Sequence, residues 1–205
     1  MVTSPAVKDL VAQGSMLGPG NQFRTKQCSV LAVFLSDLEA GKRIQRIHQL
    51  ETAAGNRHPN YMAMMPLTVS YLLGEGHAAT ALKQAAGTFL SEFKPMPQPE
   101  GIHPWSYKNT ALAVQSYVLA AESHGLGSSI MEGYDVRRLK ELLRIPDRYA
   151  VPMVVATGYT HVDDTESRTP RLDLGEIVFQ DTFGVPYDAD ALNEKEEEEE
   201  EVASI

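Results

Sequence analysis

The sequence predicts an α+β fold, an α/β sandwich with a few strands and more numerous helices. Two segments, residues 29–36 and 150–159, have the length and the nearly continuous apolar character of buried strands. Five or so other segments show the apolar period of helices. A chain of 205 residues is long enough to bury its own core. We therefore expect one domain over residues 1–187, followed by a tail over residues 188–205.

The first helix is predicted to begin at Ser4 and Pro5, because serine is a good N-cap and proline fits the first helical position. It is expected to end near Gly14. Residues 16–27, rich in glycine and proline at their start, are predicted to form a turn-rich connector. Cys28 is expected to pack beside the first strand as a small hydrophobic residue, since no histidine lies near it in sequence to activate it.

The middle of the chain is mostly helical in pattern. Residues 41–93 are interrupted three times, which predicts two or three helices with an excursion between them. Four prolines in residues 94–104 predict an irregular surface loop. The apolar residues in positions 105–124 cover nearly the whole circumference of a helix, so we expect this helix to be central and buried.

The stretch that follows, residues 124–135, holds three glycines and two serines. It is not the dinucleotide fingerprint, because a helix precedes it and Ile130 stands where the third glycine is needed. A helix C-cap at Gly125 and an N-cap at Asp135 would explain the same residues. A supple main chain that approaches a ligand is the other interpretation. An amphipathic helix is predicted over residues 135–144.

The charge of the chain is concentrated at one end. The formal net charge is −9, and residues 194–201 hold seven glutamates and one lysine, which contribute six of those negative charges. A block of like charges repels itself, so we expect a solvated, disordered tail; docking on a basic partner is the alternative. The sequence has no basic stripe interleaved with aromatic residues, so binding to nucleic acid is not expected.

Several other classes of protein are disfavoured. The longest apolar run, residues 30–35, is too short to cross a bilayer, and the N-terminus lacks the pattern of a secretory signal. A single cysteine allows no intrachain disulfide, so a reducing compartment, the cytoplasm, is expected. The six histidines lack the spacing that pairs ligands on one helix face, so no metal site is predicted. The absence of a Gly-x-Ser-x-Gly motif leaves a serine hydrolase of that class unsupported.

Short motifs occur in a specific order in the second half of the chain. They are a Gly-Leu-Gly turn (residues 125–127), a Glu-Gly-Tyr-Asp step (132–135), a Leu-x-Ile-Pro pair (143–146), a strand ending in Gly-Tyr (158–159), and Arg171 before a hydrophobic segment. This order resembles the C-terminal half of the flavin-dependent nitroreductase family.

Upstream, residues 20–37 resemble the family segment in which an asparagine and a basic residue precede the first core strand. The resemblance covers roughly residues 10–179, most weakly over residues 41–104. It implies a central, mostly antiparallel sheet flanked by helices. The basic and asparagine-bearing motifs with which family members begin have no counterpart here, so we expect a chain that lacks the family's N-terminal segment.

The resemblance also implies a cofactor, FMN, with NAD(P)H as co-substrate. Ile130, Met131, Glu132 and Gly133 would then line the isoalloxazine ring, with the main-chain N–H of Glu132 or Gly133 nearest to flavin N5. Such a donor stabilises electron density at N5 without a titrating side chain. For this reason no catalytic side chain is assigned.

Four polar residues complete the site that the resemblance implies. Asn21 would hydrogen-bond the pyrimidine edge of the flavin, and Arg24 would favour the anionic reduced form. Arg171, together with Arg168, would hold the ribityl phosphate through charge-assisted hydrogen bonds. Exposure of the two arginines on a solvated loop is the alternative.

The implied activity is FMN-dependent NAD(P)H oxidoreduction that reduces nitroaromatic, quinone or similar small-molecule acceptors by ping-pong hydride transfer. The alternative is a flavin-free family member that acts as a dimerising or interaction protein. A homodimer is expected, because a domain of this size hardly covers the apolar helix at residues 105–124 alone. In the family, each flavin lies at the subunit interface. Neither nucleic acid nor a membrane is expected as a partner.

Overall fold

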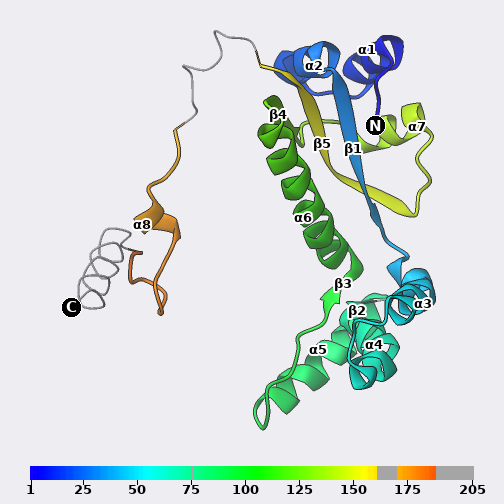
Figure 1. Ribbon diagram of the computed structural model, residues 1–205, viewed down its shortest axis with the longest axis vertical. Coiled ribbons are helices and arrows are strands. Elements are labelled where there is room, and N and C mark those ends of the chain that lie inside the picture. Colours follow the sequence, from blue (N-terminus) through cyan, green and yellow to red (C-terminus); the bar gives the residue numbers. More distant parts are fainter. Residues whose placement is uncertain (75, 161–169, 188–205) are drawn as a thin grey trace. The chain divides into compact units, whose positions relative to one another are not determined.

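The computed structural model of the chain describes residues 1–74, 76–160 and 170–187 (Figure 1). Two compact units, residues 1–160 and residues 161–205, divide the chain, and each is described by itself. The predicted acidic tail and Arg168 lie outside the described residues. Within the described ranges, no helix is both long enough and apolar enough to cross a membrane.

The first unit is built on a three-stranded sheet with the order β1–β5–β4. β1 (Val30–Asp37) and β4 (Leu126–Met131) both pair with β5 (Tyr149–Tyr159) in antiparallel register. β1 and β5 are the two strands that the sequence predicts. Val154 and Val155 in β5 are both fully buried although they point to opposite faces, which explains the continuous apolar run. The predicted α+β class, with a mostly antiparallel central sheet, is confirmed.

β4 corrects the expectation of a loop between two helices. Gly125 has a φ of +70° and ends the preceding helix, as a glycine C-cap should. From Leu126, opposite Tyr159, to Met131, opposite Val154, the chain then pairs with β5 as a strand. Its glycine and two serines have low strand propensity, so pairing with β5 and not local preference makes this segment a strand.

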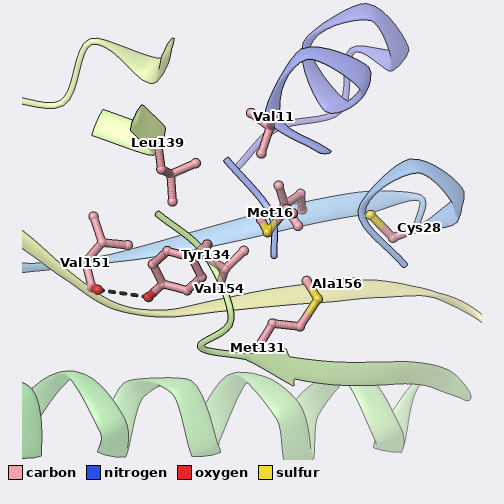
Figure 2. Packing of buried hydrophobic residues seen from close by; sticks show 10 residues of the cluster. Val11, Met16, Cys28, Met131, Tyr134, Leu139, Val151, Val154 and Ala156 are labelled. Atoms are coloured by element: carbon pink, nitrogen blue, oxygen red, sulfur yellow. Dashed lines mark hydrogen bonds between the residues drawn. The ribbon is translucent and has the colours of Figure 1, made fainter. Parts of the chain in front are cut away.

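Helices cover both faces of this sheet (Figure 1). α1 (Pro5–Gly14) and α7 (Val136–Leu143) pack on one face, and α6 (Ile102–Ser123) packs on the other. The larger core cluster lies on the α1 and α7 side and contains Val11, Met16, Cys28, Leu31, Met131, Tyr134, Leu139, Val151, Val154 and Ala156 (Figure 2). The smaller cluster lies against α6 and contains Ala32, Val114 and Val155. The two clusters confirm a sandwich.

α7 confirms the predicted amphipathic helix. The side chain of Asp135 accepts a hydrogen bond from the main-chain N–H of Arg138 at 3.0 Å, so it caps the helix as expected. Leu139 is completely buried, whereas Arg137 and Arg138 on the other face are exposed. Truncation of such a leucine to alanine would cost about 2–5 kcal/mol.

α2 (Gly18–Gln27) replaces the predicted connector. Pro19 is tolerated because it lies in the first turn, where its missing N–H has no intrahelical acceptor. The helix buries Thr25 completely, although its apolar face is otherwise weak. The glycines and proline at its start are thus a helix N-terminus and not a turn.

Between β1 and α6 the chain forms the expected helical excursion. A short 3-10 helix, η1 (Ala40–Arg43), leads into α3 (Ile44–Ala54), α4 (Pro59–Leu72) and α5 (His77–Ser91). Two very short strands, β2 (Leu73–Gly74) and β3 (Glu100–Gly101), pair in parallel beside them. The ammonium group of Lys83 donates to the carbonyl oxygens of Ser70, Tyr71 and Leu73, which satisfies the C-terminal end of α4.

α6 runs along the sheet (Figure 1), and it is buried on one side only. Val114 and Ala121 are buried, whereas Leu112 is 70% exposed and Leu119 is 60% exposed. The prediction of a helix buried all round is therefore wrong for the single chain. The sheet covers one side of the helix, and a second apolar side faces outward.

In the second unit, the described residues form one short helix, α8 (Leu174–Ile177). Asp173 caps it, and the side chain of Glu176 reaches back to the N–H of Asp173 in a capping box. Phe179 and Pro186 then form an antiparallel bridge.

Candidate functional site

The four residues that follow β4 form a loop that is anchored from several directions. The main-chain N–H of Leu17 donates to the carbonyl oxygen of Gly133 at 2.9 Å, and that of Asp135 donates to the carbonyl oxygen of Ser15 at 2.7 Å. The side chain of Tyr134 is buried in the core below the loop (Figure 2). The main chain of the loop is thus held against the connection between α1 and α2.

Two main-chain donors of this loop point to no protein acceptor. Among the described residues, the N–H groups of Glu132 and Gly133 make no hydrogen bond. Glu132 is exposed and Gly133 is half-buried, so both residues lie at the surface of the first unit. Adjacent N–H groups of this kind can donate to an electron-rich atom of a ligand.

Asn21 and Arg24 from α2 join the loop. The side-chain nitrogen of Asn21 donates to the carbonyl oxygen of Gly133 at 3.1 Å. The oxygen of the same amide accepts from Nη1 of Arg24 at 3.4 Å. Arg24 is exposed, and the part of the chain that the structure describes gives it no carboxylate partner. Residues more than a hundred positions apart thus meet in one place.

The two strand residues of the predicted site differ in what they expose. The side chain of Ile130 is 48% exposed, whereas that of Met131 is 3% exposed and belongs to the larger core cluster. The side chain of Ile130 is therefore accessible at the surface. Only the main chain of Met131 is available for contact with a ligand, because its side chain is buried in the core.

The two arginines predicted for a phosphate are not part of this first unit. Arg168 lies outside the described residues, and Arg171 belongs to the second unit, where its Nη1 donates to the carbonyl oxygen of Pro170 at 3.2 Å. Their place in the site stays a prediction.

Cys28 lies in the core, as expected, and not in the site. Burial raises the pKa of its thiol, and the nearby ammonium group of Lys8 offsets this only in part. Its Sγ donates to the carbonyl oxygen of Thr25 at 3.3 Å. Lys8, which sequence reasoning missed, is 7% exposed and donates to the carbonyl oxygen of Cys28. A thiol held neutral in this way is a packing group.

The described residues hold no group of three or more histidine, cysteine, aspartate or glutamate side chains that could bind a metal ion. The described residues of the candidate site offer hydrogen-bond donors and one cation, Arg24. Such a set binds acceptor atoms and stabilises negative charge.

Sequence reasoning also missed two anchors of the loop. The N–H of Leu17 and the side chain of Gln22, which donates to the carbonyl oxygen of Met16 at 3.2 Å, hold the α1–α2 connection in place. Main-chain contacts of this kind leave no signal in a sequence. Tyr134, the aromatic residue of the Glu-Gly-Tyr-Asp step, is an anchor that its sequence motif marks.

Comparison with solved structures supports the fold. A nitroreductase family protein from Streptococcus pneumoniae is 20% identical, with a TM-score of 0.60 over 87% of this chain and 76% of that chain. A protein from Exiguobacterium sibiricum, solved in complex with FMN, is 19% identical, with a TM-score of 0.55 over 86% of this chain and 70% of that chain. At these identities the likeness concerns the fold.

Comparison of sequences goes further. A protein of Thermus thermophilus named NADH dehydrogenase is 32% identical over 104 residues, which are 51% of this chain and 48% of that protein. Protein DrgA of Synechocystis is 32% identical over 75 residues, which are 35% of this chain and 36% of that protein. The matches thus span about half the length of these relatives or less. The sequence profile of the Nitroreductase family matches residues 30–159, more than half of the chain, from β1 to the end of β5. The chain belongs to the nitroreductase family.

Proposed function

We propose that this chain is an FMN-dependent oxidoreductase, which uses NAD(P)H to reduce nitroaromatic, quinone or similar acceptors in a ping-pong cycle. Membership of the nitroreductase family supports the reaction class. The name of the Thermus thermophilus relative, NADH dehydrogenase, supports a nicotinamide co-substrate. The related fold from Exiguobacterium sibiricum, solved with FMN, supports the choice of flavin.

One observation carries the proposal: the two unused N–H groups of Glu132 and Gly133 lie on a loop that also contacts Asn21, which in turn contacts Arg24. The isoalloxazine ring has acceptor atoms at N1, O2, O4 and N5. A surface with two main-chain donors and a guanidinium fits such a ring, because all three groups donate to acceptor atoms.

When bound, FMN supplies the hydride chemistry between the nicotinamide and the acceptor. The residues of this chain bind and orient it. The N–H groups of Glu132 and Gly133 would donate to the acceptor atoms of the ring, and the positive charge of Arg24 would favour a reduced, anionic ring. Tyr134 does not move a proton in this scheme, because its hydroxyl is buried and donates to the carbonyl oxygen of Val151.

The phosphate of FMN requires a separate cation. We assign this role to Arg171, supported by Arg168, because both precede a hydrophobic segment as in the family motif. A guanidinium group binds phosphate through two parallel charge-assisted hydrogen bonds, which makes arginine suited to this position.

We also propose that the protein is a homodimer, in which α6 packs against a second copy. Leu112 and Leu119, seven positions apart, lie on one side of this 22-residue helix and are mostly exposed in the single chain. Exposure of a row of leucines to water is unfavourable in free energy, and an identical row on a second copy would cover them.

Initial-rate kinetics test the proposed activity. The full chain, loaded with FMN, is assayed with NADH or NADPH and with a quinone or a nitroaromatic acceptor. A ping-pong cycle predicts parallel double-reciprocal lines and no turnover by the same protein without FMN. A folded, FMN-loaded protein that oxidises neither nucleotide would contradict the proposal, and a folded protein that binds no FMN would favour a flavin-free role.

A further inference from the structure

The carbonyl oxygen of Gly133 accepts two hydrogen bonds from the α1–α2 region. One comes from the main-chain N–H of Leu17 at 2.9 Å, and the other comes from Nδ2 of Asn21 at 3.1 Å. A carbonyl oxygen can only accept, so the nitrogen of the Asn21 amide must face it. One of the two N–H donors of the Asn21 amide is therefore engaged within the chain.

Gly133 leaves the space that this contact needs. A Cβ atom built on Gly133 would lie 2.4 Å from Nδ2 of Asn21, well inside any permitted contact distance. The amide of Asn21 thus occupies the volume that a side chain at position 133 would fill. Any other residue at this position would have to displace Asn21.

The acceptor side of Asn21 is engaged as well. Its Oδ1 accepts from Nη1 of Arg24 at 3.4 Å, one turn further along α2. Arg24 has a long and flexible side chain, and this contact restricts the directions that its guanidinium takes. Asn21 therefore joins the loop to the cation through its two ends.

We propose that Asn21 is a positioning residue, which holds the main chain at Glu132 and Gly133 and orients Arg24 before any flavin binds. The inference rests on the proposed function and changes one part of it. The family resemblance gives Asn21 a contact with the pyrimidine edge. In this structure its amide contacts the Gly133 carbonyl oxygen and Arg24, and we infer that it acts on the flavin through the loop donors and Arg24.

Bracing of this kind has a physical purpose. The N–H groups of Glu132 and Gly133 favour a ligand most when their directions are set in advance, because no ordering cost is then incurred on binding. A loop held by main-chain contacts alone would leave the Gly133 carbonyl with one donor. Asn21 adds the second.

Amide hydrogen exchange in the apoprotein tests the brace without any flavin. Asn21→Ala removes both contacts, whereas Asn21→Asp keeps an acceptor for Arg24 but loses the donor to Gly133. Both variants should speed exchange at Leu17, Tyr134 and Asp135 by about three- to tenfold, the effect of one lost hydrogen bond. Gln27→Ala, an exposed change in the same helix, is the control and should have no effect. Unchanged exchange in both Asn21 variants would overturn the proposal.

A double-mutant cycle tests the shared volume. Gly133→Ala should lower the melting temperature of the wild type, because the new methyl group displaces the Asn21 amide. In the Asn21→Ala background the same change should cost much less, since the space is already empty. Additive losses would mean that the two residues do not act on each other, which contradicts the proposal.

The ratio of the affinities for reduced and oxidised FMN is a measurement that a purely structural role of Asn21 would not change. Asn21→Ala should weaken binding of reduced FMN more than that of oxidised FMN, by about three- to tenfold in the ratio, as should Arg24→Ala. In the Arg24→Ala background, loss of Asn21 should leave this ratio unchanged. A further change of the affinity ratio on loss of Asn21 in the Arg24→Ala background would indicate a direct contact of Asn21 with the ring and would overturn the proposal. If the wild type binds no FMN, the proposed function fails, and the exchange result in the apoprotein alone decides the role of Asn21.

Discussion

The hydroxyl of Tyr134 donates a hydrogen bond to the main-chain carbonyl oxygen of Val151, 2.9 Å away (Figure 2). Tyr134 is 7% exposed, and Val151 lies near the start of β5. The contact ties the loop after β4 to the central strand from below, while Leu17 and Asn21 hold it from the side. The position of the candidate site thus depends on the core of the sheet.

Tyr134→Phe should lower the free energy of unfolding by about 1–2 kcal/mol at neutral pH, because the carbonyl oxygen of Val151 loses its buried donor. Burial, aided by the carboxylate of Glu132, raises the pKa of Tyr134 far above its usual value of 10.0. A tyrosine whose pKa is higher in the folded state contributes its full stabilisation at pH values below its unfolded-state pKa. The contribution is lost as the pH rises above that pKa toward the folded-state pKa.

The difference between wild type and Tyr134→Phe should therefore shrink above about pH 10, where the unfolded tyrosine ionises and the folded one does not. Urea unfolding at neutral and alkaline pH measures both effects. A difference that stays constant across this range would contradict the assigned titration.

Asp37 should govern part of the acid stability. Burial alone would raise its pKa, but the main-chain N–H of Glu39 and the guanidinium groups of Arg148 and Arg43 together lower it. Its Oδ2 lies 2.7 Å from Nη2 of Arg148, at the end of the β1–β5 ladder. A carboxyl group whose pKa is lower in the folded state stabilises the fold at pH values above its unfolded-state pKa. This stabilisation is lost as the pH falls through the folded-state pKa.

Asp37→Asn should accordingly lower the melting temperature by a few degrees at neutral pH, and the difference should fade below about pH 4. Thermal melts followed by circular dichroism across this pH range provide the measurement. Asp9→Asn, at an exposed carboxylate 4.0 Å from Lys26, is the matched control and should change little. If the difference in melting temperature between wild type and Asp37→Asn persists in acid, the ion pair is not its cause.

The sequence predicts those parts of the fold whose own residues determine them. β5 is apolar on both faces, and Val154 and Val155 are buried against different helices. Asp135 is a good N-cap, and Leu139 lies on the apolar side of the helix it begins. In these segments local preference and tertiary packing agree, so a single sequence suffices.

The parts that were missed depend on distant partners. Ser128 and Ser129 favour turns, yet they pair with Thr157 and Ala156 across the ladder.

The exposure of one side of α6 was missed for another reason. The leucines of α6, such as Leu112, have the pattern of a buried helix, and a pattern does not tell whether the same chain or a second copy covers them.

The sequence suggests the residues of the candidate site but not their contacts, and their role in binding flavin stays a prediction. The resemblance places Asn21, Arg24 and Gly133 in one site, and the hydrogen bonds bring these three together. That Asn21 bonds to the carbonyl oxygen of Gly133 could not be foreseen, because it depends on the path of the main chain. Side-chain chemistry alone gave no reason to expect this bond.

Arg171→Ala should raise the dissociation constant of FMN by about ten- to a hundredfold, the effect of one lost charge-assisted contact to phosphate. High salt should reduce the difference, since the contact is electrostatic. Fluorescence titration of FMN into the two apoproteins measures it, with Arg46→Ala, an exposed arginine in α3, as the control. Equal affinity of wild type and Arg171→Ala would transfer the role to Arg168.

Leu112→Asp together with Leu119→Asp should convert a dimer to a monomer at micromolar concentration, because two charges would enter the proposed α6 contact. Sedimentation velocity measures the mass. Val136→Asp serves as the control: Val136 is 43% exposed at the start of α7, on the other face of the sheet, and its change should leave the dimer intact. A folded wild-type monomer at this concentration would rule out the α6 dimer.

The central claim is that the donors at Glu132 and Gly133, with Asn21 and Arg24, form a flavin site. The most direct measurement is the visible absorbance spectrum of the full chain, incubated with FMN, freed of unbound cofactor and mixed with NADH or NADPH without oxygen. We expect a spectrum of bound oxidised flavin that bleaches on addition of the nucleotide and returns when a quinone is added. A folded protein that retains no flavin absorbance after removal of free FMN would contradict it.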